Sequence, residues 1–183
     1  MDALEALIGR VSPAQLVDPG PSAEQLQQIL VAGASAPDHG RMQPWRFTVI
    51  AGDARARFGE LMAQSLLRRE PMSPEAKLDA ERKKALRAPV IIAVAAVIRE
   101  NPNVPAVEQI IAAGAAAQNM LLAAHAMGLG GFWRTGAFAY DAEVKQALGL
   151  AETDAIVAIL YIGSIGHPGK ARQVDVDAVT RRL

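Results

Sequence analysis

The sequence contains no cysteine at all. This absence excludes a disulfide framework, a thiolate nucleophile, a zinc site ligated by cysteine and an iron–sulfur cluster. A chain without thiols also fits a reducing cytoplasm without further argument. Several classes of redox and hydrolytic enzyme are therefore excluded before any motif is considered.

Net charge is also absent, because 19 lysine and arginine residues balance 19 aspartate and glutamate residues. The chain generates no overall field that would draw it onto nucleic acid or an anionic membrane, so any phosphate site must be local. The acidic start, Met1 to Glu5, lacks the basic region and apolar core of a signal peptide. The longest apolar stretch, 110–117, is far shorter than the roughly 20 residues of a membrane span. We therefore expect a soluble, cytoplasmic protein.

Aromatic residues are few, at 4%, although 51% of the residues are hydrophobic. The apolar character therefore comes mainly from alanine, leucine, isoleucine and valine. Helices rich in alanine can approach each other closely, because the distance between helix axes depends on the side chains at the contact. This composition gives weak support to a dimer held together by helices.

The 183 residues suffice for one compact domain, 1–183, with a substantial core. The hydrophobic pattern predicts helices over residues 2–8, 22–32, 53–69, 74–87, 107–127 and 141–148. It predicts strands over 44–50, 90–98, 132–134 and 155–163, and a polar loop between the first two helices. Ser22, Asp53, Ser73 and Asp141 are the expected helix caps. Strands alternating with helices indicate an α+β or α/β fold, in which the helix 107–127, apolar over most of its circumference, must be buried.

Two glycine-containing segments resemble nucleotide-binding loops but do not match the spacing or the element order of those motifs. The segment 163–170 follows a strand, but Ser164 and Ala171 stand where a phosphate-binding loop of the GxxxxGK[ST] type requires glycine and a hydroxyl residue. The glycines of 128–131 close a helix and open a strand, which is the reverse of a dinucleotide-binding fingerprint. Neither segment therefore supports a nucleotide site of the usual kinds.

The three histidines, His39, His125 and His167, are scattered, and none has a second ligand at a convincing spacing. We therefore expect no metal site. His125 lies in the apolar helix, where a hydrogen-bonded core histidine is the usual case. His39 lies in a polar loop and could contact a ligand, cap a helix or simply be exposed.

Three polar clusters remain at the ends of the expected elements. They are 10–12 after the first helix, 35–45 before the first strand, and 133–136 after the second glycine group. Binding residues concentrate at such positions on rigid scaffolds, but ordinary turn residues do so too. Taken singly, none of the clusters indicates a function.

Together and in this order, the clusters resemble the flavin-dependent nitroreductase family, especially its short bacterial members. The resemblance covers nearly the whole chain, from the start with Arg10 and Ser12, through the blocks 36–39 and 42–45, to the Gly-Gly-Phe-Trp-Arg run at 130–134. It implies an α+β nitroreductase-like fold, with a central sheet flanked by helices. It also implies a domain-swapped homodimer with two non-covalently bound FMN molecules at the interface, each site built from both subunits.

The resemblance also assigns positions to the cofactor. Arg10 and Ser12 match the family's Arg-x-Ser element at the FMN phosphate, which suits a planar guanidinium and a short hydroxyl. The intervening residue is often arginine in the family, so Val11 can offer only its backbone. The other positions that match cofactor contacts are Ser35, His39, Trp133, Arg134, Thr135, Lys170 and Arg172. Trp45 is expected to be a core residue instead, and the roles of Arg41 and Gln43 stay open.

By the same resemblance, FMN takes a hydride from NADH or NADPH and passes it to a nitro compound or quinone in a ping-pong cycle. The flavin supplies the chemistry, so no side chain is expected to be catalytic. Ene reduction, dehalogenation and flavin fragmentation on the same fold remain alternatives. A flavin-binding protein with little turnover also remains possible, because the segment 65–105, which covers the active site in longer members, is short.

Overall fold

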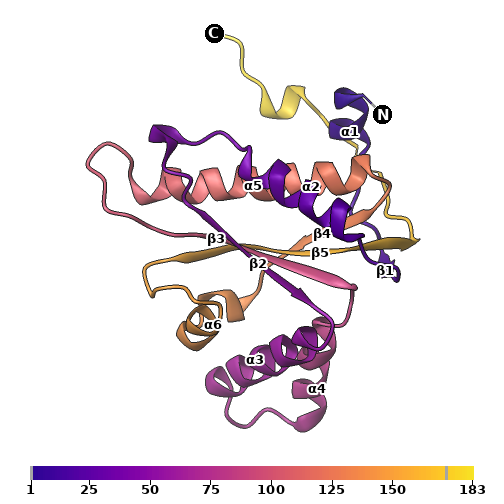
Figure 1. Ribbon diagram of the computed structural model, residues 1–183, viewed down its shortest axis with the longest axis vertical. Helices are drawn as coiled ribbons and strands as arrows, with labels where there is room; N and C mark the ends of the chain where they lie inside the picture. Colours follow the sequence, from indigo (N-terminus) through magenta and orange to yellow (C-terminus); the bar gives the residue numbers. More distant parts are fainter. Residues whose placement is uncertain (1, 172) are drawn as a thin grey trace.

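The computed structural model describes residues 2–171 and 173–183, in which five strands form one antiparallel sheet (Figure 1). The strands are β1 (Gln15–Val17), β2 (Trp45–Ala51), β3 (Val90–Ala96), β4 (Gly130–Arg134) and β5 (Ala155–His167). β5 is the axis of the sheet: β3 pairs along one side of it, while β4 and then β1 pair along the other. β2 extends the sheet beyond β3. Because all the pairs are antiparallel, the α+β class is confirmed and the α/β alternative is not.

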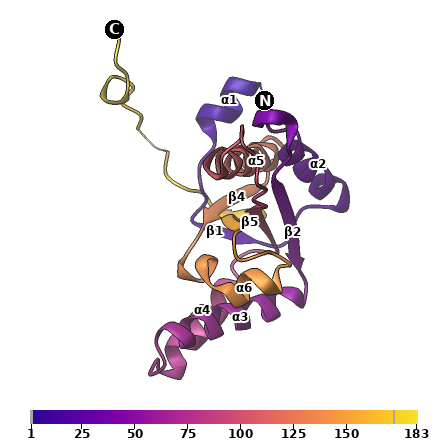
Figure 2. The ribbon, with the colours of Figure 1, turned by 90° about the vertical axis from the view of Figure 1, so that its left-hand side faces the viewer.

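Helices cover both faces of this sheet (Figures 1 and 2). The helices α2 (Ala23–Ala34) and α5 (Ala106–Ala126) lie on one face, and α3 (Ala54–Arg69), α4 (Glu75–Lys84) and α6 (Ala142–Ala147) lie on the other. All seven residues of β3 are buried, since alternate side chains enter two separate cores. Ile92 packs on the α5 side and Ile91 on the α3 side. This two-sided burial explains the nearly unbroken apolar run that predicted the strand.

Helix α5 is buried on one side only, so the expectation of full burial is wrong for a single chain. Ala113, Ala116 and Ala117 are fully covered by the sheet and α2, and their small side chains allow that close approach. On the outer side Val107 and Ile111 are 58% and 65% exposed. The apolar outer face is thus left without a partner inside the described part of the chain. No helix in that part is long and apolar enough to cross a membrane.

The predicted caps were right at two helices and wrong at two. Ser22 forms a reciprocal capping box with Gln25, and Asp141 accepts hydrogen bonds from the first amides of α6. Asp53 stands at the start of α3 but makes no capping hydrogen bond. The fourth helix begins at Glu75, with Pro74 rather than Ser73 at its cap, and it ends at Lys84 rather than Arg87.

The short strand β1 lies where the sequence predicted only a loop. Its three residues pair with the far end of β5, so that Leu16 faces Ile165. The pairing also lengthens β5 to His167, beyond the expected end at Gly163. Nothing local marks this strand, because its hydrogen bonds go to residues about 150 positions later in the chain. Sequence periodicity over three residues cannot report such a pairing.

Asp141 should be a stabilising residue, because its carboxylate joins two elements. It caps α6 and also accepts hydrogen bonds from Arg68 of α3 at 2.9 and 3.1 Å. We expect Asp141→Ala to lower the free energy of unfolding by about 1–2 kcal/mol, measured by urea denaturation. Glu143→Ala is the matched control, since Glu143 is exposed, pairs with the same arginine and caps nothing. An equal loss in both variants would contradict the capping role.

The same carboxylate should make stability depend on acid pH. Burial opposes its ionisation, but hydrogen bonds from Arg68 and from the Val144 amide outweigh that effect and lower the pKa of Asp141 from 3.8 to about 2. Because the folded-state pKa is the lower one, the stabilisation is present above about pH 4 and is lost as the pH falls through the folded value. The difference in unfolding free energy between the native chain and Asp141→Ala should therefore shrink in that range.

Candidate functional site

The segment that follows α1 (Ala3–Gly9) contains a half-buried arginine with one buried, unpaired nitrogen. Nη1 of Arg10 is shielded from solvent and makes no hydrogen bond within the described residues. Buried polar groups are normally hydrogen-bonded, and leaving a charged one unsatisfied is costly. The neighbouring Val11 and Ser12 are half-buried. The guanidinium is therefore well suited to an anion that is supplied from outside the chain.

The end of β5 brings the start of the C-terminal tail to this segment. The Ala14 amide donates a hydrogen bond of 3.0 Å to the His167 carbonyl. A Cβ atom on Gly169 would lie 1.9 Å from the Ser12 carbonyl oxygen, so the two backbones meet closely and only glycine fits there. Lys170, the next residue, is thereby brought beside the Arg10–Ser12 segment, where the resemblance expects it. Arg172 lies outside the described residues.

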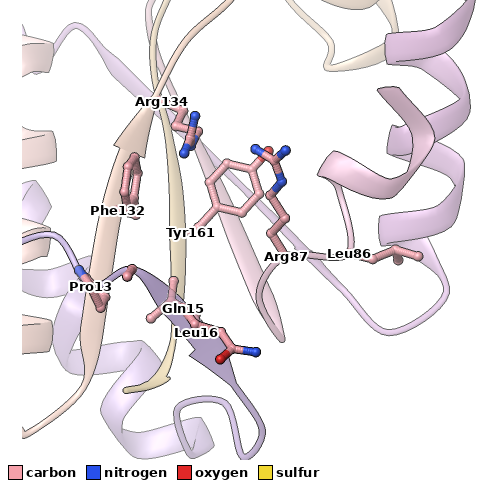
Figure 3. Close-up of a pocket in the computed structure, with 9 residues that line it drawn as sticks. Pro13, Gln15, Leu16, Leu86, Arg87, Phe132, Arg134 and Tyr161 are labelled. Carbon is pink, nitrogen blue, oxygen red and sulfur yellow. The ribbon is translucent and has the colours of Figure 1, made fainter. Parts of the chain in front are cut away.

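A cavity of about 510 Å³ opens directly beyond Ser12 (Figure 3). Residues 13–16 form one wall, and Leu86 and Arg87 form another. Phe132, Arg134 and Tyr161 of the sheet form the remaining wall. The Arg134 guanidinium carbon lies 4.3 Å from the centre of the Phe132 ring. The cavity therefore combines apolar and aromatic surfaces with two cationic groups.

Tyr161 lines this cavity and pairs with Phe132 in the β4–β5 register. In Figure 3 its ring lies between Arg134 and Arg87. Burial raises the pKa of the Tyr161 hydroxyl, and the charges of Arg87 and Arg134 only partly offset that effect. The phenol is therefore a neutral hydrogen-bond donor at physiological pH.

Tyr161, Arg87 and Phe132 were not predicted from the sequence. Tyr161 lies inside a strand that the sequence marks only as buried, and Arg87 ends a charged run that reads as a solvated face. Phe132 belongs to the predicted strand after the glycine group, but only the register of β4 on β5 shows that it faces the cavity. In the sequence, only the alternation of side chains along this strand indicates that Phe132 and Arg134 share a face.

The residues of β4 point alternately to the two faces of the sheet. Arg134 lines the cavity, and Thr135 lines a smaller one beside it. The Trp133 side chain packs on the opposite face, against the core beneath α5. A Cβ atom on Gly114 of α5 would lie 4.0 Å from its ring. Within this chain, the Trp133 side chain therefore does not line the cavity, contrary to the expectation that it contacts the flavin. Trp45 packs into the same core, as expected.

The remaining predicted residues, Ser35 and His39, lie elsewhere. Nδ1 of His39 is 2.5 Å from a carboxylate oxygen of Glu108, in the first turn of α5. Ser35 ends α2 and donates a hydrogen bond of 2.8 Å to the Val31 carbonyl. At the other end of α5, Gly9 lies beside His125. Since a helix rises 1.5 Å per residue, the seventeen residues from 108 to 125 separate the Arg10 and His39 groups by about 25 Å.

The loop around His39 holds an unfavourable backbone. Arg41 and Gln43 have φ values of 52° and 46°, a region that non-glycine residues rarely adopt. The Gln43 amide donates to the Asp38 carboxylate at 2.8 Å, and Arg99 donates to the Met42 and Gln43 carbonyls at 2.6 and 3.2 Å. Such strain persists only where surrounding contacts impose it, and it concentrates at functional sites.

The donor set offers no metal site, since no group of three or more His, Asp or Glu side chains gathers among residues 2–171 and 173–183.

Comparison with known proteins agrees with this geometry. The model of the nitroreductase family matches residues 10–164. YdjA of Escherichia coli (strain K12), which is named as an NAD(P)H nitroreductase, is 46% identical over 164 residues, covering 90% of this chain and 88% of its own. A nitroreductase-like protein from Bacillus cereus superposes with a TM-score of 0.83 at 22% identity, over 100% of this chain and 96% of that one. A nitroreductase structure from Desulfovibrio desulfuricans in complex with FMN has a TM-score of 0.76 at 28% identity, over 100% and 98% of the two chains.

Arg99 should hold the strained loop in place. In Arg99→Ala, the carbonyls of Met42 and Gln43 lose their shared donor, so we expect the Gln43 amide to exchange with deuterium roughly tenfold faster. Hydrogen–deuterium exchange with peptide-level resolution measures this. Arg46→Ala, an exposed change on β2, should leave the rate as it is. Unaltered exchange in Arg99→Ala would show that the loop is held by other contacts.

Proposed function

Because the chain belongs to the nitroreductase family, we infer that it is an NAD(P)H-dependent oxidoreductase, and we propose that it works as a cytoplasmic homodimer with FMN bound non-covalently. The fold is nitroreductase-like, as FMN-bound and other family structures superpose on it. The acceptor we propose is a small nitro compound or quinone. The observation that carries the proposal is the buried, unpaired Nη1 of Arg10, three residues before Pro13, the first residue of the chain that lines the 510 Å³ cavity.

The residues present fit FMN along its length. Its phosphate would meet Arg10, the Ser12 hydroxyl and the Val11 backbone, with Lys170 beside them and Arg172 contributing from the tail. A phosphate bound by a guanidinium fork gains charge-assisted hydrogen bonds and gives the buried Nη1 its missing partner. The ring would then follow residues 13–16 into the cavity, where Leu16, Phe132 and Tyr161 offer apolar surfaces. Residues 10–12, proposed for the phosphate, directly precede residues 13–16, which line the cavity proposed for the ring. Neighbouring segments of the chain would therefore hold neighbouring parts of the cofactor.

When bound, FMN supplies the redox chemistry, taking two electrons and a proton equivalent from NADH or NADPH and delivering them to the acceptor. For a nitro acceptor the balance is R–NO₂ + NAD(P)H + H⁺ → R–NO + NAD(P)⁺ + H₂O. The chain would contribute position and electrostatics: Arg87 and Arg134, which line the cavity, would stabilise the negative charge of a reduced ring bound there. Tyr161 adds a neutral donor. No side chain needs to act as a dedicated acid or base.

Two protomers would build each site. His39 lies about 25 Å along α5 from Arg10, which is too far for both side chains to contact the same end of one FMN within a single chain. The exposed apolar residues of α5, such as Val107 and Ile111, offer a surface for a second copy. The segment 173–183 lies away from the rest of the chain (Figures 1 and 2) and exposes Val174 and Val179. Such an arm fits a domain-swapped dimer in which each tail packs on the partner.

The direct test of the function is anaerobic reduction of the bound flavin. The purified protein should be yellow, and NADH or NADPH should bleach the flavin absorption in the absence of oxygen. A nitro compound or quinone should then restore the absorption. If neither nicotinamide bleaches a flavin that is demonstrably bound, the chain is a flavin-binding protein rather than a reductase.

Arg10→Ala should weaken FMN binding between ten- and a hundredfold, because a charge-assisted hydrogen bond contributes about 1.5–3 kcal/mol. Fluorescence titration of the apoprotein with FMN measures the dissociation constant. The FMN affinity of Arg10→Lys should lie between those of the native protein and Arg10→Ala, since lysine keeps the charge but lacks the planar guanidinium. Arg57→Ala, an exposed change on α3, is the control. Native affinity in Arg10→Ala would remove this residue from the phosphate site.

Ile111→Asp should disrupt the dimer, because a carboxylate would be buried in an apolar interface. Light scattering coupled to size exclusion should show a shift from twice the chain mass towards the chain mass, and FMN should be lost with it. Met72→Asp, at an even more exposed position in the α3–α4 turn, should leave both the dimer and the bound FMN in place. A fully dimeric Ile111→Asp variant would place the interface on another surface.

A further inference from the structure

A second cavity, of about 270 Å³, adjoins the one proposed for the flavin ring. The two cavities share three lining residues, Arg87, Arg134 and Tyr161. The second cavity lies between the α3–α4 helices and the chain that follows β4, and it includes Thr135 and Gly136. A molecule that reaches the flavin from this side would therefore place its far end in the smaller cavity.

The charges around the smaller cavity are unbalanced. Its lining contains five cationic side chains and only two acidic ones, Glu70 and Glu81. Both acids are already paired, Glu70 with Lys77 and Glu81 with Lys84. The other three cations are Arg69, Arg87 and Arg134, and among the described residues none of them has an ion-pair partner. Three exposed arginines without an ion-pair partner among the described residues therefore line the rim of one small cavity.

The floor of the same cavity is apolar. Met62 and Leu66 of α3 supply part of it, and Phe138 supplies the rest, held edge-on to Phe58 with ring centres 5.9 Å apart. An apolar floor under a cationic rim suits a molecule with a flat hydrocarbon part and one anionic group. Ligand sites usually combine a mainly apolar lining with a few polar groups that fix orientation.

We propose that this cavity selects an anionic acceptor, a single-ring aromatic compound that carries a carboxylate or a similar group beside its reducible substituent. The inference rests on the proposed function, since it assumes that the larger cavity holds the flavin. Arg69 and Arg87 bind the anionic group, and the ring lies between Phe138 and the flavin. The volume favours a one-ring acceptor over the phosphates of a dinucleotide, because sites for larger ligands begin at about 300 Å³.

Binding without turnover tests the proposal independently of any reductase activity. Benzoate carries the carboxylate but no reducible group, and benzamide is its neutral counterpart. Titrated into the FMN-loaded protein and followed by the flavin absorption spectrum, benzoate should bind at least about tenfold more tightly than benzamide. Equal affinities would overturn the proposal, even in a protein that NADPH reduces normally.

Charge-neutralising variants locate the anion. Arg69→Gln changes only the smaller cavity, so it should keep native FMN affinity while losing about tenfold in benzoate affinity. Arg87→Gln should lose at least as much benzoate affinity, and Arg87→Lys, which keeps the charge, should retain part of that affinity. Arg57→Gln removes the same charge from α3 outside both cavities and should bind benzoate normally. Native benzoate affinity in Arg69→Gln would contradict the assignment, whether or not Arg87→Gln retains flavin.

Steady-state kinetics separates the acceptor from the nicotinamide as the source of the anion. With 4-nitrobenzoate and its methyl ester, Arg69→Gln should raise KM for the acid about tenfold and leave the ester and the KM for NADPH unchanged. A rise in KM for NADPH alone would assign the arginines to the phosphates of the donor and overturn the proposal. If the flavin is not reduced at all, the proposed function fails, while the benzoate titration still decides the anion site.

Discussion

The length of α5 is the constraint on which the rest of this account depends. The helix is one rigid element of 21 residues, with the Arg10 segment beside one end and His39 paired to Glu108 near the other. Its inner face is filled by alanines that the sheet and α2 cover, while its outer face keeps exposed isoleucine and valine. The helix thus separates two sets of proposed binding residues and leaves an apolar surface uncovered. Association of two chains would cover the surface and bring unlike ends of the two helices together.

The alternation of side chains in β4 and β5 determines which residues line the two cavities and which enter the core under α5. Phe132, Arg134 and Tyr161 face the α3 side, whereas Trp133 is held in the core under α5. This strand pair thus supplies both the aromatic residues of the cavity and one of its two cations, Arg134. Because the same arginines line two neighbouring cavities, electrostatic support for the flavin and selection of an acceptor would be coupled. Replacing Arg87 or Arg134 should therefore affect both flavin binding and acceptor binding. Arg69 lines only the smaller cavity, so its replacement tests acceptor binding alone.

The sequence predicted most of what is encoded locally, apart from the caps of α3 and α4, and missed what depends on distant pairing. The capping box at Ser22, the buried strands and the helical segments follow from residues within a few positions of each other. Strand β1 was missed because its partners lie at the far end of the chain. The motif at Arg10 was found by resemblance to a family, but its buried unpaired nitrogen is visible only in the structure. Likewise Arg87 looked like part of a solvated helix face until the fold placed it against Tyr161.

Complementation between two defective chains tests the central claim, a flavin site shared by two protomers, most directly. Arg10→Ala and His39→Ala would each damage both sites of their own homodimer. In a dimer of one chain of each kind, one site carries both changes and the other carries neither. Measured by flavin content after tandem-affinity purification, the mixed dimer should bind about one FMN per two chains with native affinity, as the arrangement of two unlike half-sites requires. A mixed dimer that binds no more tightly than either parent would show that Arg10 and His39 serve the same site within one chain.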